Sequence, residues 1–64
     1  MTQSDQIKII NAGFTIIRAD LFRMAIKTKK GSFEWRTLEK GFPSKAALER
    51  RMKELLTDPK TIED

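Results

Sequence analysis

Basic side chains concentrate in the middle of this chain, and the chemistry they could do is phosphate binding. Residues 18–45 carry eight lysines and arginines against three carboxylates, a net charge of +5, whereas residues 1–17 and 46–64 carry 0 and −1. Such a field attracts polyanions, and guanidinium and ammonium groups bind phosphate oxygens directly. The candidate nucleic-acid-binding residues are Arg23, Lys27, Lys29, Lys30 and Arg36.

Residue types that carry most catalysis are missing. The 64 residues include no His and no Cys, so there is no imidazole base, no thiol nucleophile and no thiolate or imidazole metal ligand. The nine carboxylates form no paired motif, and the three glycines form no phosphate-binding loop. The sequence therefore predicts no enzyme, no cofactor and no small-molecule substrate.

Two strands with period-two alternation would position the cations. In the first, apolar residues alternate with others: Phe22, Met24 and Ile26 against Arg23, Ala25 and Lys27. The second alternates in the same way: Phe33, Trp35 and Thr37 against Glu34, Arg36 and Leu38. Gly31 tolerates the positive φ of a tight turn between them.

A turn centred on Lys30-Gly31 predicts the register of this hairpin. It sets Ile26 opposite Trp35, Met24 opposite Thr37 and Lys27 opposite Glu34, whereas a slip of one residue would bury a charge. The predicted core face consists of Phe22, Met24, Ile26, Phe33 and Trp35. We therefore expect Trp35 to be buried, and Trp35→Ala to cost about 3–5 kcal/mol.

A helix follows the hairpin. Ser44 is a good N-cap, Asp58-Pro59 is a stop, and a stripe of apolar residues lies between them: Leu48, Met52, Leu55 and Leu56. Residues 14–18 predict a further strand, and a short helix capped by Ser4 or Asp5 precedes it. The predicted fold is α+β: a three-stranded antiparallel meander packed on one C-terminal helix, with a short N-terminal helix or extended segment. It forms one domain, 1–64, with 1–4 and 58–64 flexible.

The facing of the strand at 14–18 depends on the turn that follows it. An odd-length turn puts Phe14 and Ile16 toward the helix and an even one puts Thr15 and Ile17 there; we favour the first, which buries more apolar area. Either way one isoleucine is left on the far face, beside Ala25 and Leu38. The N-terminal helix could cover it, or a second subunit, and so small a domain without disulfides has reason to dimerise.

The segment GFPSKAALERRMKELL after a three-stranded meander resembles the N-terminal arm-type DNA-binding domain of phage-like tyrosine integrases, which has a similar cap and helix. Plant ethylene-response-type DNA-binding domains share the layout. The resemblance covers residues 14–56 and implies that the sheet enters the DNA major groove, with Arg23, Lys27 and Arg36 in contact. The chain departs from the integrase pattern, because its 64 residues include no catalytic domain and carry an extra segment before the first predicted strand. As a whole the chain is similar to short bacterial proteins of a kind associated with mobile elements.

Together these features predict a small basic binding module whose partner is nucleic acid, bound through the outer face of the sheet. The alternative is a homodimeric protein-interaction or accessory protein, in which the lysines only keep the sheet soluble. No apolar run approaches the roughly 20 residues of a bilayer span, and the N-terminus has no basic signal region. We expect a cytoplasmic protein without membrane contact.

Overall fold

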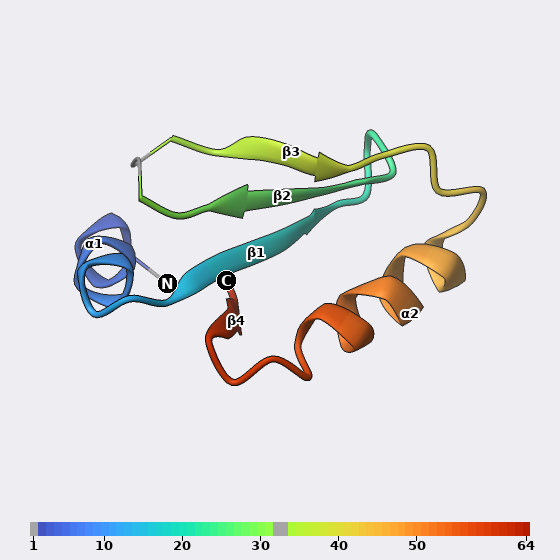
Figure 1. The fold of residues 1–64 in the computed structure, drawn as a ribbon. Coiled ribbons are helices and arrows are strands. Elements are labelled where there is room, and N and C mark those ends of the chain that lie inside the picture. The colour runs from blue at the N-terminus through green and yellow to red at the C-terminus, as the bar shows by residue number, and fades with distance from the viewer. Residues whose placement is uncertain (1, 32–33) are drawn as a thin grey trace.

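Four strands form one mixed sheet, with two helices packed against it (Figure 1). The structure is a computed structural model that describes residues 2–31 and 34–64. The elements in chain order are α1 (Gln3–Asn11), β1 (Thr15–Asp20), β2 (Ala25–Lys29), β3 (Arg36–Glu39), α2 (Lys45–Leu55) and β4 (Thr61–Glu63). The strand order across the sheet is β3-β2-β1-β4. The α+β class is confirmed, but the sheet has four strands instead of three.

The helix α2 covers one face of the sheet and forms the core with it. The buried cluster contains Ile17 of β1, Ile26 of β2, and Leu48 and Met52 of α2. Partly buried apolar residues close around this cluster: Met24, Phe42, Leu55 and Leu56. The apolar stripe predicted on this helix is therefore confirmed.

The start of α2 follows from its first residues. Ser44 is extended, and its hydroxyl oxygen accepts a hydrogen bond from the backbone N–H of Ala47 at 3.2 Å. This bond satisfies one of the N–H groups that an α-helix leaves without a partner in its first turn. The predicted N-cap is confirmed, and it sets where α2 begins over the sheet.

The helix α1 packs on the opposite face, toward the start of β1 (Figure 1). Thr2, and not Ser4 or Asp5, is its N-cap, because the Thr2 hydroxyl accepts from the N–H of Asp5. Gln6 and Ile10 are its buried residues. Ile16 of β1 is fully buried on this side. Of the two predicted ways to cover the isoleucine on this face, the N-terminal helix is the one observed, and no second subunit is needed.

The facing preferred for the first strand is wrong. Ile17 belongs to the cluster under α2, and Ile16 points to the other face because neighbouring strand residues alternate. The β1–β2 pairing sets Ile16 opposite Lys29 and Asp20 opposite Ala25, which leaves Leu21–Met24 as an even, four-residue turn. An even turn was the alternative that placed Ile17 inward.

The predicted register of the β2–β3 hairpin is also wrong. Lys27 pairs with Thr37 instead of Glu34, a shift of three residues, and a bulge follows between Ile26 and Lys27. Because the connection from Lys29 to Arg36 is longer than a tight turn, pairing begins farther from Gly31. A shift by an odd number moves Arg36 and Thr37 to the other face, whereas at Ile26, beyond the bulge, the pairing with Glu39 is shifted by four residues. Trp35 accordingly lies away from α2, and Phe42 is the aromatic residue that packs on the core.

Phe22 and Met24 were predicted within a strand, and both lie in the β1–β2 turn. The Asp20 carboxylate accepts a hydrogen bond from the N–H of Arg23 at 3.2 Å, which stabilises the turn and delays the start of β2 to Ala25. Phe22 is 94% exposed, so its predicted place in the core is wrong. Met24 has a φ of +49° and still packs against the core cluster. Phe33, the remaining predicted core residue, lies outside the described residues.

The strand β4 was not expected, since residues 58–64 read as a loose tail. Thr61–Glu63 pair in parallel with Thr15–Ile17, on the side of β1 that β2 does not occupy. Two backbone bonds flank the pairing: the N–H of Thr15 donates to the carbonyl of Lys60 at 2.7 Å, and that of Asp64 donates to the carbonyl of Ile17 at 2.8 Å. β1 is thus an interior strand and offers no free edge to a second subunit.

Candidate nucleic-acid interface

The five cations predicted to form one surface lie on both faces of the sheet. Lys27 and Lys29 alternate with Ile26 and so lie on the face away from α2. Arg36 pairs with Thr28, which puts it on the α2 face. Arg23 is exposed in the β1–β2 turn, and Lys30 is exposed just after β2. The register shift described above moves Arg36 to the α2 face, and the bounds of β2 leave Arg23 and Lys30 outside the strand.

Lys29 is a buried cation. It is only 5% exposed, and its Nζ donates to Oε1 of Gln6 in α1 at 2.9 Å. Gln6 in turn donates from Nε2 to Oδ1 of Asp64 at 3.0 Å. A buried ammonium needs such partners, because an unpaired charge away from water is costly. Lys29 therefore ties α1 to β2 and is not free to reach a phosphate.

Trp35 stands over the same face as a half-buried aromatic ring. The guanidinium carbon of Arg18 lies 4.8 Å from the ring centroid, and Nζ of Lys29 lies 5.1 Å from it. Both distances are within the range of cation–π attraction, which holds the indole against β1 and β2. Arg18 also forms an ion pair with Asp64, with 3.7 Å between Nη1 and Oδ2.

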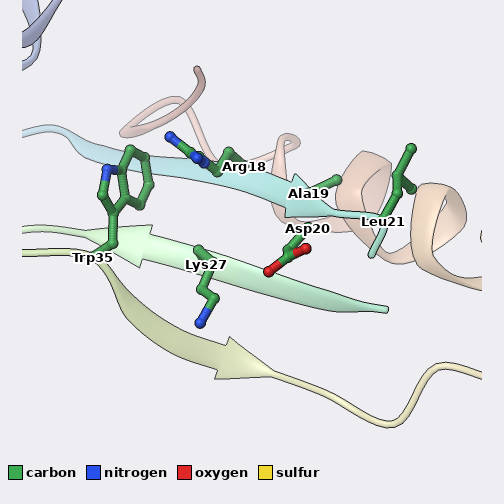
Figure 2. A pocket seen from close by; sticks show the side chains of 6 residues that line it. All are labelled: Arg18, Ala19, Asp20, Leu21, Lys27 and Trp35. Atoms are coloured by element: carbon green, nitrogen blue, oxygen red, sulfur yellow. The ribbon is translucent and has the colours of Figure 1, made fainter. Parts of the chain in front are cut away.

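A surface pocket of about 380 Å³ opens beside this ring (Figure 2). We call it the Trp35 pocket; its lining residues are Arg18, Ala19, Asp20, Leu21, Lys27 and Trp35. Figure 2 shows the Arg18 side chain next to the indole, and Lys27 projecting from the neighbouring strand. Nζ of Lys27 donates to Oγ1 of Thr37 at 3.0 Å, which fixes its direction across β3. The pocket thus combines two cations, one carboxylate and one aromatic face.

Arg18 was counted in the basic stretch but was not among the predicted site residues. The β1–β2 register sets it directly opposite Lys27, so the two cations are cross-strand neighbours. Knowledge that the turn at Leu21–Met24 has an even number of residues would have predicted this pairing, because an even turn places Arg18 on the same face as Lys27. The missing information was the length of that turn.

Lys30 and Arg36 gather elsewhere. Together with Thr28 and Glu34 they line a second hollow of about 320 Å³, near the end of the hairpin. Its charges are two cations and one carboxylate, and the described part of its lining contains no aromatic ring. It offers a place for an anion but no stacking surface.

Two of the four cations of α2, Lys45 and Arg51, are engaged by carboxylates. Arg51 donates to Glu39 of β3 from Nε at 2.9 Å and to Glu54 from Nη1 at 2.9 Å. These hydrogen bonds, first to Glu39 and then to Glu54, hold the pKa of Arg51 above its ordinary value. Lys45 pairs with Glu49 at 3.8 Å. These two α2 cations are therefore less available to a phosphate than a cation without a carboxylate partner.

Two further findings concern residues 2–31 and 34–64. Within these ranges no three carboxylates come together in a group that could hold a metal ion. Neither α1 nor α2 is long and apolar enough to cross a bilayer.

Comparison of the chain with protein-family models, with curated proteins and with solved structures finds no match. The resemblance to the arm-type domain of integrases is not tested by these comparisons and stays a prediction.

Proposed function

We propose that the chain is a nucleic-acid-binding module that takes a single strand across the sheet face bearing the Trp35 pocket. The observation that carries this proposal is the meeting of the half-buried Trp35 indole with Arg18 and Lys27 in one pocket on one face of a small sheet. Single-stranded nucleic acids are bound in this way, with bases stacked on aromatic side chains and phosphates along a basic groove.

The dimensions and charges of the site support one base beside Trp35. A volume of about 380 Å³ falls near the lower end of small-ligand pockets, which suits a single planar group. Arg18 and Lys27 lie on adjacent strands at the rim, where the flanking phosphates of a strand crossing the sheet would run. The Asp20 carboxylate at the pocket wall disfavours a bare phosphate inside it and favours the N–H groups of a base.

This proposal revises which cations do the binding. Lys27 is kept from the residues predicted by sequence, and Arg18 is added. Lys29 does not contact the nucleic acid; it holds Trp35 and α1 in place. Arg23, Lys30 and Arg36 contribute only to the general positive field, because they lie in the turn or around the second hollow. A single strand also replaces the duplex that the integrase resemblance implies.

The test uses Trp35 as its own reporter, since it is the only tryptophan of the chain. Single-stranded DNA, single-stranded RNA and duplex DNA oligonucleotides are titrated at two salt concentrations while Trp35 fluorescence and oligonucleotide anisotropy are followed. Stacking should quench the indole with the single strands and not with the duplex. Trp35→Ala should weaken single-strand binding by about 5- to 150-fold, the range expected when one base no longer stacks on an aromatic ring.

Charge variants separate direct phosphate binding from bulk attraction. Arg18→Gln/Lys27→Gln should weaken binding and flatten the log–log salt dependence by about 0.7 for each phosphate that is no longer neutralised. Arg50→Gln/Lys53→Gln on α2 removes the same net charge and should change affinity little. Equal losses in the two double variants, or binding without quenching of Trp35, would contradict the proposed interface.

The second candidate function is that of a homodimeric protein-interaction or accessory module with no nucleic-acid role. The exposed side chains of Phe22 and its neighbour Leu21 favour it, because adjacent apolar side chains left in water form a surface that a protein partner could cover. Absence of binding to all three oligonucleotides at low salt would leave this candidate as the better one.

A further inference from the structure

We propose that the chain self-associates through the β1–β2 turn, with Phe22 of each copy seated in a groove between β1 and α2 of the other. This inference is independent of the nucleic-acid proposal, because it uses the turn and a groove that the Trp35 pocket does not include, apart from the shared residues Ala19 and Leu21.

The turn presents Phe22 in a defined position. Phe22 is 94% exposed and its neighbour Leu21 is 49% exposed. The Asp20 carboxylate holds the N–H of Arg23, and Met24 packs on the core with a left-handed backbone. A bulky residue at positive φ is uncommon and persists only where the surroundings hold it. The turn is therefore held at both ends, and Phe22 projects from it without a partner among the described residues.

The receiving groove has the size and character for a phenyl ring. It encloses about 260 Å³ beside the turn, and its apolar lining comes from Ala19 and Leu21 of the sheet side and from Met52 and Leu56 of the helix side. Apolar concave sites of this kind take an aromatic anchor from a partner and supply most of the binding energy. Burial of Phe22 there would remove from water both the phenyl ring and the apolar lining of the groove.

Charges around the groove select the partner. Glu49 and Glu63 stand at its rim with Lys53. Arg23 follows Phe22 in the turn, is exposed, and forms no ion pair within residues 2–31 and 34–64. A turn that inserts Phe22 would bring Arg23 to the acidic rim, so the groove complements the turn of this same chain in charge as well as in shape.

The arrangement can close on itself. Leu21 lines the groove and is adjacent to Phe22, so the donating and receiving surfaces touch within one chain. Two turns packed antiparallel can therefore exchange Phe22 reciprocally about a twofold axis near Leu21, as a symmetric dimer requires. The buried area is small, and we expect a weak dimer with a dissociation constant between about 10 μM and 1 mM.

The first experiment is sedimentation equilibrium of the parent chain, Phe22→Ala and Leu38→Ala from about 10 μM to 2 mM. Leu38 is a matched control, because it is 45% exposed on β3 and lines neither the groove nor the turn. Phe22→Ala should raise the dimer dissociation constant by about 30-fold or more, the effect of losing an anchor residue, and Leu38→Ala by less than about threefold. A parent chain that stays monomeric throughout, or equal effects of the two variants, overturns the proposal.

A charge exchange tests the contact without removing Phe22. In a dimer of Arg23→Glu, the new carboxylate would meet the acidic rim of the other copy. In a dimer of Glu49→Arg/Glu63→Arg, Arg23 would meet a basic rim. Like charges repel in both dimers, so each variant alone should be monomeric. Mixed one to one, they restore opposite charges at both halves of the interface, and a heterodimer should form with roughly the parent affinity. Dimers in either unmixed variant, or none in the mixture, would show that Arg23 does not meet this rim.

Discussion

The two faces of the sheet are built by different means. Under α2 the contacts are apolar, and Ile17, Ile26, Leu48 and Met52 exclude water by packing together. On the other face α1 buries Ile16 but is joined to the sheet through Lys29, Gln6 and Asp64. Beyond α1 this face carries Arg18, Lys27 and Trp35 around an open pocket.

The difference separates the apolar core from the proposed nucleic-acid site. Hydrophobic burial is non-directional and tolerates many partners of the right size, so the α2 face needs only apolar residues at the correct period. Hydrogen-bonded and cation–π contacts are directional and leave polar atoms accessible at their margin. The face with α1 can therefore offer a ligand site, while the α2 face holds the hydrophobic core cluster.

The largest expected effect is on the α2 face. Leu48→Ala should reduce the free energy of unfolding by about 2–5 kcal/mol, because Leu48 is fully buried in the core cluster and truncation leaves a cavity. Urea denaturation followed by circular dichroism measures the loss. The exposed Leu38→Ala is the matched control and should stay within about 0.5 kcal/mol. Similar losses in the two variants would contradict the assignment of the core.

Lys29→Ala tests the polar junction on the other face. Removal of the ammonium leaves Oε1 of Gln6 without its partner at 2.9 Å in a buried position, so we expect a loss of about 1.5–3 kcal/mol. The control is Lys30→Ala, one residue later and exposed, which should cost less than about 0.5 kcal/mol. The same denaturation measurement applies, and a neutral Lys29→Ala would mean that α1 docks without this junction.

Trp35→Ala sharpens the comparison because the largest side chain should not give the largest loss. A half-buried ring held by Arg18 and Lys29 should contribute about 1–2 kcal/mol, less than Leu48 and less than the 3–5 kcal/mol expected of a core tryptophan. Acrylamide should also quench the native fluorescence of Trp35 more than that of a core indole. A larger loss in the free energy of unfolding than that of Leu48→Ala would indicate that Trp35 is a core residue.

The smallest effect concerns the start of α2. Ser44→Ala removes the hydrogen bond from Ala47 N–H and should cost about 1 kcal/mol, whereas Ser44→Asp keeps an acceptor there and should cost little. Thermal unfolding of the two variants gives the comparison. If both variants lose the same stability, the cap is not what positions α2 over the sheet.

Features of this fold that depend on residues close together in the sequence were predictable, and features that depend on the pairing of distant residues were not. The cap at Ser44 and the stripe through Leu48 and Met52 are local patterns, and both were correct. The hairpin register depends on the length of a connection in which Gly31 was the only turn signal, and the three-residue error moved Trp35 to the other face. The β4 strand has three residues, too few for a periodic pattern.

The candidate site was less predictable than the fold. Lys27 was placed on the correct face, because alternation along β2 alone puts it on the face opposite to Ile26. Arg18 was missed as a site residue because its place beside Lys27 depends on the even turn at Leu21–Met24, and Arg36 was misplaced because its face depends on the shifted register. Each error arises from a turn, where one residue more or less reverses every side chain beyond it.

The parallel pairing of β4 with β1 also bears on how this protein could misassemble. Only the three residues of β4 pair with the backbone edge of β1 at Thr15, Ile16 and Ile17, and they are distant from β1 in the sequence. Short elements held by few contacts open before the rest of a fold, and an opened edge rich in β-branched residues is a template for strand addition. Brief release of β4 would expose such an edge while the core under α2 stays intact. Aggregation at high concentration should then begin from a nearly native state.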